Sequence, residues 1–349
     1  MLIADDSALM RSLLIEQIGA NSDFEVVGEA ATGYEAIRLV HQLKPDVLTL
    51  DLAMPDLGGL EALRYIMSQA PLPVVIVSAQ TRALADSAIR ALMEYGAVDI
   101  VPKPLGSSIT DMQAFRQRLT QSLYLSLSAR LRRLPTHVRP QPRTPQPEHT
   151  DHSPARCVVA IAASTGGPRA LSHIVPRLPT DLPAAILIVQ HMPALFTTYL
   201  ARRLDTLSEV SVCDARDGML IQEGVAYVAP AGMHLDLERR DDTVHACLTD
   251  GPAVWGVRPA ADVLFHAVAR TFGPASVAVV LTGMGRDGAD GVRAIAAVGG
   301  NALVQDEDSC VVASMPRAAA PFADAVVPLD NIAADIVART RSLVGSRHL

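Results

Sequence analysis

The stretch that decides the fold of the second half of this chain is Val158-Val159-Ala160-Ile161-Ala162-Ala163-Ser164-Thr165-Gly166-Gly167-Pro168. Its first six residues form a continuous apolar run, which is typical of a strand buried on both faces of a parallel sheet. The run ends at a hydroxyl, two glycines and a proline, and a helical pattern follows. This order predicts that Ser164 lies at the carboxyl edge of the sheet, where open α/β sheets bind their ligands.

Two roles are open for Ser164. The turn is close to the nucleophile elbow G-x-S-x-G, with Ala162 at the place of the first glycine. The amides of the first helical turn are left free to face a bound group. A serine at such a turn can equally be a structural cap of the helix. The stretch alone does not decide between nucleophile and cap.

Length and composition restrict the class of protein. The 349 residues are enough for two domains, and 49% of them are hydrophobic. A net charge of −7 disfavours a nucleic-acid binder, which needs a basic face. The four cysteines match no metal spacing and favour reduced thiols, as in a cytoplasmic protein. Because no apolar run approaches ~18 residues, we expect no membrane insertion.

The first ~105 residues alternate strand-like runs with helical patterns such as Leu9 to Ile18 and Ala83 to Glu94. This alternation predicts a doubly wound parallel α/β sheet with right-handed crossovers. The runs are Leu2 to Ala4, Phe24 to Val27, Val47 to Leu50, Val74 to Val77 and Val98 to Val101.

Polar residues follow four of these runs. Asp5 and Asp6 follow the first, Asp51 the third, Ser78 the fourth and Lys103 the fifth. Since the carboxyl ends of parallel strands meet at one edge, these side chains should converge. A single aspartate at a strand end is usually a helix cap, but crowded carboxylates bind a hard cation such as Mg²⁺. A cation together with Lys103 would let Asp51 accept a phosphoryl group, since both neutralise the added charge.

This half of the chain resembles the receiver domain of bacterial response regulators. The resemblance implies a flavodoxin-like (βα)5 domain in which a sensor kinase phosphorylates Asp51 and Ser78 and Lys103 act in the switch. Mg²⁺ would be held by Asp5, Asp6, Asp51 and the carbonyl of Ala53. Gly58-Gly59 stands where the family usually has Asp-Gly, a change that leaves the acidic residues intact. The matching residues are Asp5 to Arg11, Asp51, Met54-Pro55, Ser78 and Lys103-Pro104.

The first strand begins almost at Met1, so the chain before Asp5 is several residues shorter than in most receivers. A strand expected to lie centrally would then carry a charged amine close to buried backbone, and no acidic residue lies near it in sequence. Desolvating an unpaired charge is costly. We therefore expect the native chain to start a few residues upstream.

The sequence divides into a receiver domain (1–130), a linker (131–155) and a second domain (156–345). Residues 109–134 show the spacing of one amphipathic helix. From Pro135 to Pro154, six prolines alternate with polar and basic residues, which is typical of an extended linker.

In the second domain, three strand-like runs end in chemically useful residues. The first ends at Ser164, the run Ala185 to Val189 leads to His191, and the run Ser276 to Thr282 leads to Asp287. A hydroxyl nucleophile needs a base, and the base needs a carboxylate to fix its tautomer. Taken singly, His191 is more often a satisfied strand-end histidine and Asp287 a turn residue. Together the three predict a catalytic triad with no cofactor for catalysis.

Gly283, Gly285 and Gly288 also match G-x-G-x-x-G between a strand and a helix, the dinucleotide fingerprint. An acidic Asp287 in that loop would repel a pyrophosphate unless Arg286 compensated. Because of the fingerprint match, the alternative function is a receiver-controlled, dinucleotide-dependent oxidoreductase. A phospho-regulated scaffold without catalysis is a third.

The second domain resembles the catalytic domain of the protein-glutamate methylesterase (CheB) family of chemotaxis response regulators. One departure is the loop Ala253 to Val257, where the family more often has polar residues. The motifs that carry the resemblance are Ala163 to Gly167, Gln190 to Pro193, Tyr227 to Gly232, Arg258 to Phe265, Leu281 to Gly288, Ser309 to Val312 and Met315-Pro316.

The resemblance implies a phosphorylation-activated hydrolase of chemotactic adaptation. Its substrates would be glutamate γ-methyl esters and certain glutamines of methyl-accepting chemoreceptors, and the chemotaxis histidine kinase would donate the phosphoryl group. His191 would take the Ser164 proton and Asp287 would hold the imidazole. Thr165 and Met284 would meet the oxyanion with backbone amides, and Arg258 would contact substrate.

Overall fold

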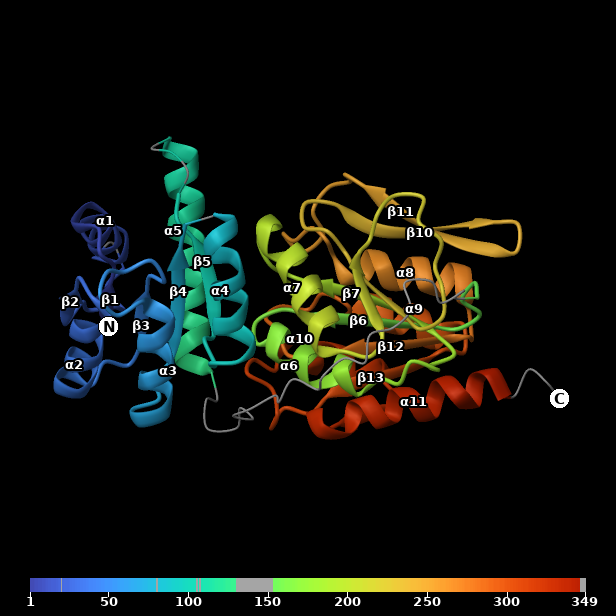
Figure 1. Cartoon of the computed structure of the whole chain (residues 1–349). Helices are drawn as coiled ribbons and strands as arrows, with labels where there is room; N and C mark the ends of the chain where they lie inside the picture. The colour runs from blue at the N-terminus through green and yellow to red at the C-terminus, as the bar shows by residue number, and fades with distance from the viewer. Residues whose placement is uncertain (20, 80, 105, 107, 130–152, 346–349) are drawn as a thin grey trace. The chain divides into compact units, whose positions relative to one another are not determined.

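A computed structural model of the chain describes residues 1–19, 21–79, 81–104, 106, 108–129 and 153–345. The chain divides into two compact units, residues 1–137 and 138–349 (Figure 1). The expected proline-rich linker, residues 131–155, lies outside the described residues except for 153–155. Those three residues contact other residues of the second unit, and Pro154 forms an isolated β-bridge with Gln222.

The sheet of the first unit has the strand order β2-β1-β3-β4-β5, and every pair is parallel. This is the flavodoxin-like order, so the predicted (βα)5 fold is confirmed. Parallel pairing brings the carboxyl ends of the strands to one edge of the sheet. The strands are β1 (Leu2–Ala4), β2 (Gly28–Ala30), β3 (Leu48–Leu50), β4 (Val74–Ser78) and β5 (Asp99–Pro102).

Helices cover both faces of this sheet. One core cluster joins α1 and α5 to the same face, with Leu14 and Phe115 packed against Val75. The last helix is shorter than the predicted 109–134, because Ala129 already has an extended backbone. The helices are α1 (Ala8–Gly19), α2 (Gly33–Leu43), α3 (Gly59–Gln69), α4 (Arg82–Met93) and α5 (Ile109–Ser128).

The second strand lies at Gly28–Ala30, so its prediction at 24–27 was wrong. Phe24 and Val26 are half-buried against the core, and the Val27 amide donates to the Met1 carbonyl at 2.9 Å. The apolar residues therefore belong to the segment that leads into the strand. Burial alone does not distinguish such a segment from the strand itself.

The short strand β1 pairs with β2 on one side and β3 on the other. The Met1 amino group donates to the Glu25 carbonyl. Burial lowers the pKa of this amine, while the nearby Asp46 and Glu25 carboxylates act to raise it. The fold thus brings to the amine the acidic neighbours that the local sequence lacks.

The second unit contains a seven-stranded sheet in the order β14-β13-β12-β6-β7-β9-β8, again parallel throughout. The chain leaves β6 toward β7 on one side and returns to β12 on the other. Ligands of open α/β sheets bind at such a reversal of strand order. The strands are β6 (Val158–Ala163), β7 (Ala185–Gln190), β8 (Ser211–Asp214), β9 (Val225–Val228), β12 (Ser276–Val280), β13 (Asn301–Gln305) and β14 (Ala325–Val327).

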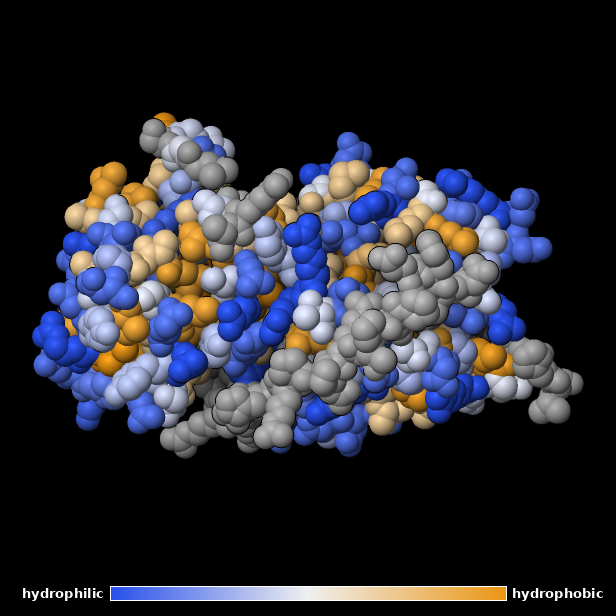
Figure 2. Space-filling view, viewed as in Figure 1, coloured by the Kyte–Doolittle hydropathy of each residue, from blue (hydrophilic) through white to orange (hydrophobic). Residues whose placement is uncertain are grey.

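An antiparallel hairpin, β10 (His234–Arg240) and β11 (Thr243–Thr249), adds to this unit. Its inward residues, such as Leu235 and Val244, join the same core as Phe265 of α8. Its tip, residues 238–242, is exposed and hydrophilic (Figure 2). The helices are α6 (Gly167–Ile174), η2 (Val175–Arg177), α7 (Ala194–Leu207), α8 (Ala261–Phe272), α9 (Ala289–Ala297), α10 (Ser314–Ala319), η3 (Ala320–Phe322) and α11 (Leu329–Gly345).

The four cysteines, all within the described residues, form no disulfide. Within the described part of the chain, no helix is both long enough and apolar enough to cross a membrane.

Candidate functional site

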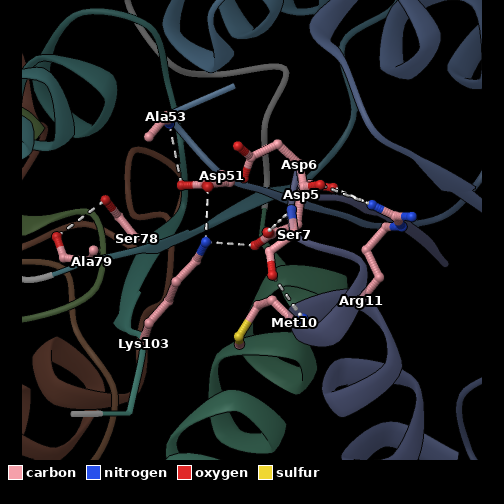
Figure 3. Close-up of polar contacts among 10 residues, drawn as sticks. All are labelled: Asp5, Asp6, Ser7, Met10, Arg11, Asp51, Ala53, Ser78, Ala79 and Lys103. Atoms are coloured by element: carbon pink, nitrogen blue, oxygen red, sulfur yellow. Dashed lines mark hydrogen bonds and ion pairs between the residues drawn. The ribbon is translucent and has the colours of Figure 1, made fainter. Parts of the chain in front are cut away.

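The first candidate site is the acidic edge of the receiver sheet (Figure 3). Oxygen atoms of Asp5, Asp6 and Asp51 lie within 4.8 Å of one another. Asp5 and Asp51 are buried, whereas Asp6 is exposed. The structure therefore brings together the three carboxylates that the sequence placed at separate strand ends.

Lys103 joins two of these carboxylates. Its Nζ lies 2.7 Å from Asp5 Oδ2 and 2.8 Å from Asp51 Oδ2. Burial raises the pKa of Asp5, and Lys103 acts against that rise. Burial also opposes the charge of Lys103, but its hydrogen bonds to Asp5 and Asp51 raise its pKa. The lysine thus stays charged beside the acids.

The buried Asp5 Oδ2 lies 2.7 Å from Lys103 Nζ, and no other polar group of the described residues contacts it. An under-satisfied carboxylate oxygen beside two further acids fits a hard cation with oxygen ligands. The donor set at this edge therefore suits Mg²⁺.

Ser78 ends β4 and is fully buried. Its hydroxyl donates to the carbonyl of Ala79 at 3.4 Å, as Figure 3 shows. Arg11 is a contributor to which sequence reasoning gave no role. Its guanidinium donates to the backbone carbonyls of Asp5 at 2.9 Å and Asp6 at 3.3 Å, which fixes the acidic turn.

The second candidate site is the edge formed by β6, β7 and β12. The amide of Ser164, directly after β6, donates to the carbonyl of Thr282 at 3.0 Å. Gly283 packs so closely that a Cβ there would lie 2.6 Å from Ser164 Cβ. Gly166 has a φ of 78°, a left-handed conformation that favours glycine. The predicted sharp turn between strand and helix is thus present.

His191 and Asp287 form a pair at this edge. His191 Nε2 lies 2.8 Å from Asp287 Oδ2, and both side chains are at least 90% buried. The His191 amide donates to the carbonyl of Ala163, the residue before Ser164, at 3.0 Å. Within the described residues, the Ser164 hydroxyl has no hydrogen-bond partner. The structure therefore places all three predicted residues at one edge, with the histidine–carboxylate contact already made.

Asp287 is held by a helix as well as by the histidine. Its Oδ2 accepts from the amide of Ala261 at 2.6 Å, and its Oδ1 accepts from the amide of Asp262 at 2.9 Å. These amides open α8, and amides at a helix N-terminus stabilise a negative charge. The carboxylate is therefore oriented by the fold.

Gln190 and Thr282 support the serine turn. The buried Gln190 Nε2 donates to the carbonyls of Ser164 at 2.9 Å and His191 at 3.0 Å. Thr282 Oγ1 donates to the Thr165 carbonyl at 2.9 Å and accepts from the amide of Val311 at 3.1 Å. In the sequence, both are polar residues at the end of an apolar run, and this position was the signal that could have identified them as supports of the turn.

The three residues predicted to meet substrate lie in different settings. The Thr165 amide has no hydrogen-bond partner within the described residues. Met284 lies in the exposed loop after β12. Arg258 donates to the carbonyls of Asp250 at 2.6 Å and Gly251 at 2.9 Å, so its guanidinium binds its own loop.

Comparison with known families decides between the alternatives. The family model for CheB methylesterase matches residues 159–336. The chain belongs to the CheB methylesterase family. The model for the response regulator receiver domain matches residues 1–114, so the recognition of both halves is confirmed.

Relatives cover nearly the whole chain. A protein-glutamate methylesterase/protein-glutamine glutaminase of Pyrococcus horikoshii is 42% identical over 100% of this chain and 95% of its own length. One of Geobacillus kaustophilus is 41% identical over 97% of each chain. The solved catalytic domain of Thermotoga maritima CheB methylesterase is 39% identical, with a TM-score of 0.52 over 52% of this chain and 97% of that domain.

These likenesses support a methylesterase with a receiver domain and do not support the dinucleotide-dependent oxidoreductase. The loop that matches the dinucleotide fingerprint is used differently here. Its first glycine, Gly283, packs on Ser164, and Asp287 near its end contacts His191. This loop therefore lies at the same sheet edge as Ser164 and His191.

Asp262 and Trp255 are neighbours of the site that sequence reasoning did not assign to it. Asp262 Oδ1 accepts from the amide of Gly291 at 2.7 Å, and its Oδ2 accepts from the Trp255 indole at 2.7 Å. Burial raises the pKa of Asp262, these two hydrogen bonds lower it, and the nearby charge of Asp287 raises it further. No local pattern could have shown these contacts, because they join α8 to the start of α9 and to the loop that carries Trp255.

Proposed function

We propose that this chain hydrolyses glutamate γ-methyl esters of chemoreceptors, releasing methanol and leaving a glutamate carboxylate. The observation that carries the proposal is the His191–Asp287 pair at the sheet edge that also carries Ser164. A serine beside an oriented imidazole is the arrangement needed for acyl transfer. Glutamine side chains are amides of the same acid, so the same site would deamidate them with release of ammonia.

We propose a role for each ring nitrogen of His191. Nε2 faces Asp287 Oδ2 and therefore carries the proton of that hydrogen bond. Nδ1 then holds the lone pair and is the base for the Ser164 hydroxyl. Ser164 Oγ attacks the ester carbonyl, the imidazolium returns the proton to the departing methoxide, and water then cleaves the acyl-enzyme.

The oxyanion would be met by backbone amides. The Thr165 amide, directly after the nucleophile, is unused by the described residues and suits this role. The Met284 amide would be the second donor, since Met284 follows the glycine that packs on Ser164. Arg258, by holding residues 250 and 251, would shape the substrate-facing loop.

In the receiver unit, Asp51 would accept a phosphoryl group from a chemotaxis histidine kinase. Asp5, Asp6 and Asp51 would hold Mg²⁺, which would neutralise phosphoryl oxygens during transfer. Lys103 already contacts Asp51 and would stay beside the added charge, while the buried Ser78 hydroxyl would reorient from the Ala79 carbonyl. The cytoplasmic location inferred from composition stays a prediction.

Methanol release from methylated receptor tests the proposal directly. The full chain should release methanol, and a small phosphoryl donor with Mg²⁺ should increase the rate. Ser164→Ala should release none above the uncatalysed background. If Ser164→Ala kept substantial activity, the nucleophile assignment would be wrong.

A further inference from the structure

Trp255 lies at a tight turn in the loop between β11 and α8. Val254 and Val257 exchange backbone hydrogen bonds of 3.1 and 3.0 Å across the turn. Trp255 has a φ of 55° and Gly256 a φ of 78°. A bulky residue in this left-handed region is strained, and such strain persists only where the surroundings impose it. The indole hydrogen bond to Asp262, at 2.7 Å, is one such constraint.

Arg286 is the other partner of this ring. Its guanidinium carbon lies 4.6 Å from the centroid of the Trp255 ring, within range for a cation–π contact. Within the described residues the guanidinium has no hydrogen bond or ion pair, and the side chain is exposed. The ring thus holds an arginine in place while leaving its donors free.

The position of Arg286 relates this pair to the serine site. The loop begins at Gly283, against Ser164, and reaches Asp287, against His191. Arg286 immediately precedes Asp287. The Trp255 loop is also fixed, because His234 contacts the Pro252 carbonyl at 3.1 Å. Both partners therefore sit on loops that are ordered beside the proposed catalytic residues.

We propose that Trp255 and Arg286 form a carboxylate-binding subsite that selects substrates with an acidic side chain beside the scissile glutamyl ester. This inference rests on the proposed function. A guanidinium fork matches a carboxylate with two parallel hydrogen bonds, and stacking fixes the fork beforehand. Hydrolysis itself creates glutamate carboxylates, so a segment with several esters becomes more acidic as it is processed. A protein with a net charge of −7 needs a local cation to hold such a segment.

Two synthetic peptides test the selection. Each carries one glutamyl γ-methyl ester, flanked by glutamates in the first and by glutamines in the second. The full chain, with Mg²⁺ and a small phosphoryl donor, should hydrolyse the acidic peptide with a kcat/KM about threefold to fivefold higher, as expected for an exposed charge pair. The difference should lie in KM, because the subsite binds without reacting.

The variants separate binding from structure. Arg286→Gln should lose the preference for the acidic peptide and keep its rate on the neutral one. Trp255→Ala should weaken the preference although the arginine remains, since the guanidinium loses its support. Arg293→Gln is the matched control: Arg293 also lies over a ring, that of Phe322, but is already paired with Asp290 at 3.2 Å. It should keep the preference.

A second measurement is independent of catalysis. Trp255 is the only tryptophan of the chain, so its fluorescence reports binding at the subsite. In Ser164→Ala protein, the acidic peptide should bind more tightly than the neutral one, and Arg286→Gln should remove the difference. The proposed subsite would be wrong if the two peptides bound equally tightly, or if Arg286→Gln weakened the binding of both peptides to the same extent. If neither peptide released methanol, the proposed function would fail, and the fluorescence result alone would decide this inference.

Discussion

Asp287 and Asp262 each accept hydrogen bonds from the first turn of a helix. Asp287 lies just before α9 and accepts from α8, whereas Asp262 lies in the first turn of α8 and accepts from α9. Asp287 caps α8 through Ala261 and Asp262, while Asp262 caps α9 through Gly291. The N-cap residues themselves, Ala260 and Gly288, offer no side-chain acceptor. The two carboxylates therefore replace the missing caps and lock the helices to each other. This fixes Asp287 in position for His191.

Replacing any member of the proposed triad should abolish esterase activity. Ser164→Ala and His191→Ala should each reduce kcat to near background, and Asp287→Asn should reduce it by roughly 10³–10⁴-fold, because the amide no longer fixes the imidazole tautomer. Residues that act as a unit lose activity non-additively, so a double variant should be little worse than the poorer single one. Methanol release measures each rate, and circular dichroism checks the fold. Additive losses would contradict a triad.

Asp262 predicts a specific dependence of stability on pH. Burial, with the charge of Asp287, raises its pKa in the folded state above the ordinary value of 3.8. Between these two pKa values the folded state binds more protons than the unfolded state, so stability falls as pH rises. Asp262→Asn cannot titrate. The stability of the natural chain relative to this variant should therefore decline from low pH through the raised pKa and then level off.

Urea unfolding followed by the fluorescence of Trp255 would measure this, because that residue reports on the second unit. Glu307→Gln, which alters an exposed ion pair with Arg317 in the same unit, is the control. A difference between Asp262→Asn and the natural chain that did not change with pH would contradict the raised pKa.

At the scale of elements, the site depends on two loops that approach with almost no space between them. A Cβ on Gly283 would lie 2.3 Å from Met315 Sδ and 2.6 Å from Ser164 Cβ. The close approach lets the loop after β12 reach the turn after β6. Glycine is required here for lack of space.

Gly283→Ala should therefore lower both activity and stability, the latter by about 1–3 kcal/mol, the usual cost of overpacking. The displaced Ser164 should also lower kcat on a small activated ester, which needs no receptor contacts. Gly251→Ala is the control, because its nearest neighbour would be 3.9 Å away. Equal stability and equal kcat of the Gly283→Ala and Gly251→Ala variants would show that the loop after β12 can move away without cost.

At the scale of the whole molecule, each unit contains a hydrophobic core cluster of its own residues. The second unit should therefore fold alone. The amide of Ala155 donates to the carbonyl of Ile221, and the Glu223 amide donates to the carbonyl of Ser153. A fragment of this unit should therefore start at Ser153 and keep these bonds.

Regulation by the receiver predicts the activities of this fragment and of Asp51→Asn. If the unphosphorylated receiver inhibits catalysis, the fragment should release methanol faster than the unphosphorylated full chain. Asp51→Asn should stay at the basal rate when a phosphoryl donor is added. A fragment no faster than the full chain would show that the receiver does not inhibit it.

Local sequence patterns predicted most of the fold. Continuous apolar runs such as Val158 to Ala163 mark strands that are buried on both faces, and the alternation with helical patterns gives parallel sheets. The exception was the second strand, where buried lead-in residues carry the same apolar pattern. The residues at strand ends were also predictable, because parallel strands deliver their ends to one edge.

By itself, the sequence determined the strand–turn–helix units and the residues at their ends, since these depend on neighbours along the chain. The hydrogen-bond partners of the individual side chains depend on how the elements pack in three dimensions. The pairing of Asp287 with α8, of Asp262 with Trp255 and of Trp255 with Arg286 joins segments that no local pattern links. The physical reason is that a buried carboxylate takes whatever donors the packed fold brings to it, and the packing of whole elements chooses those donors.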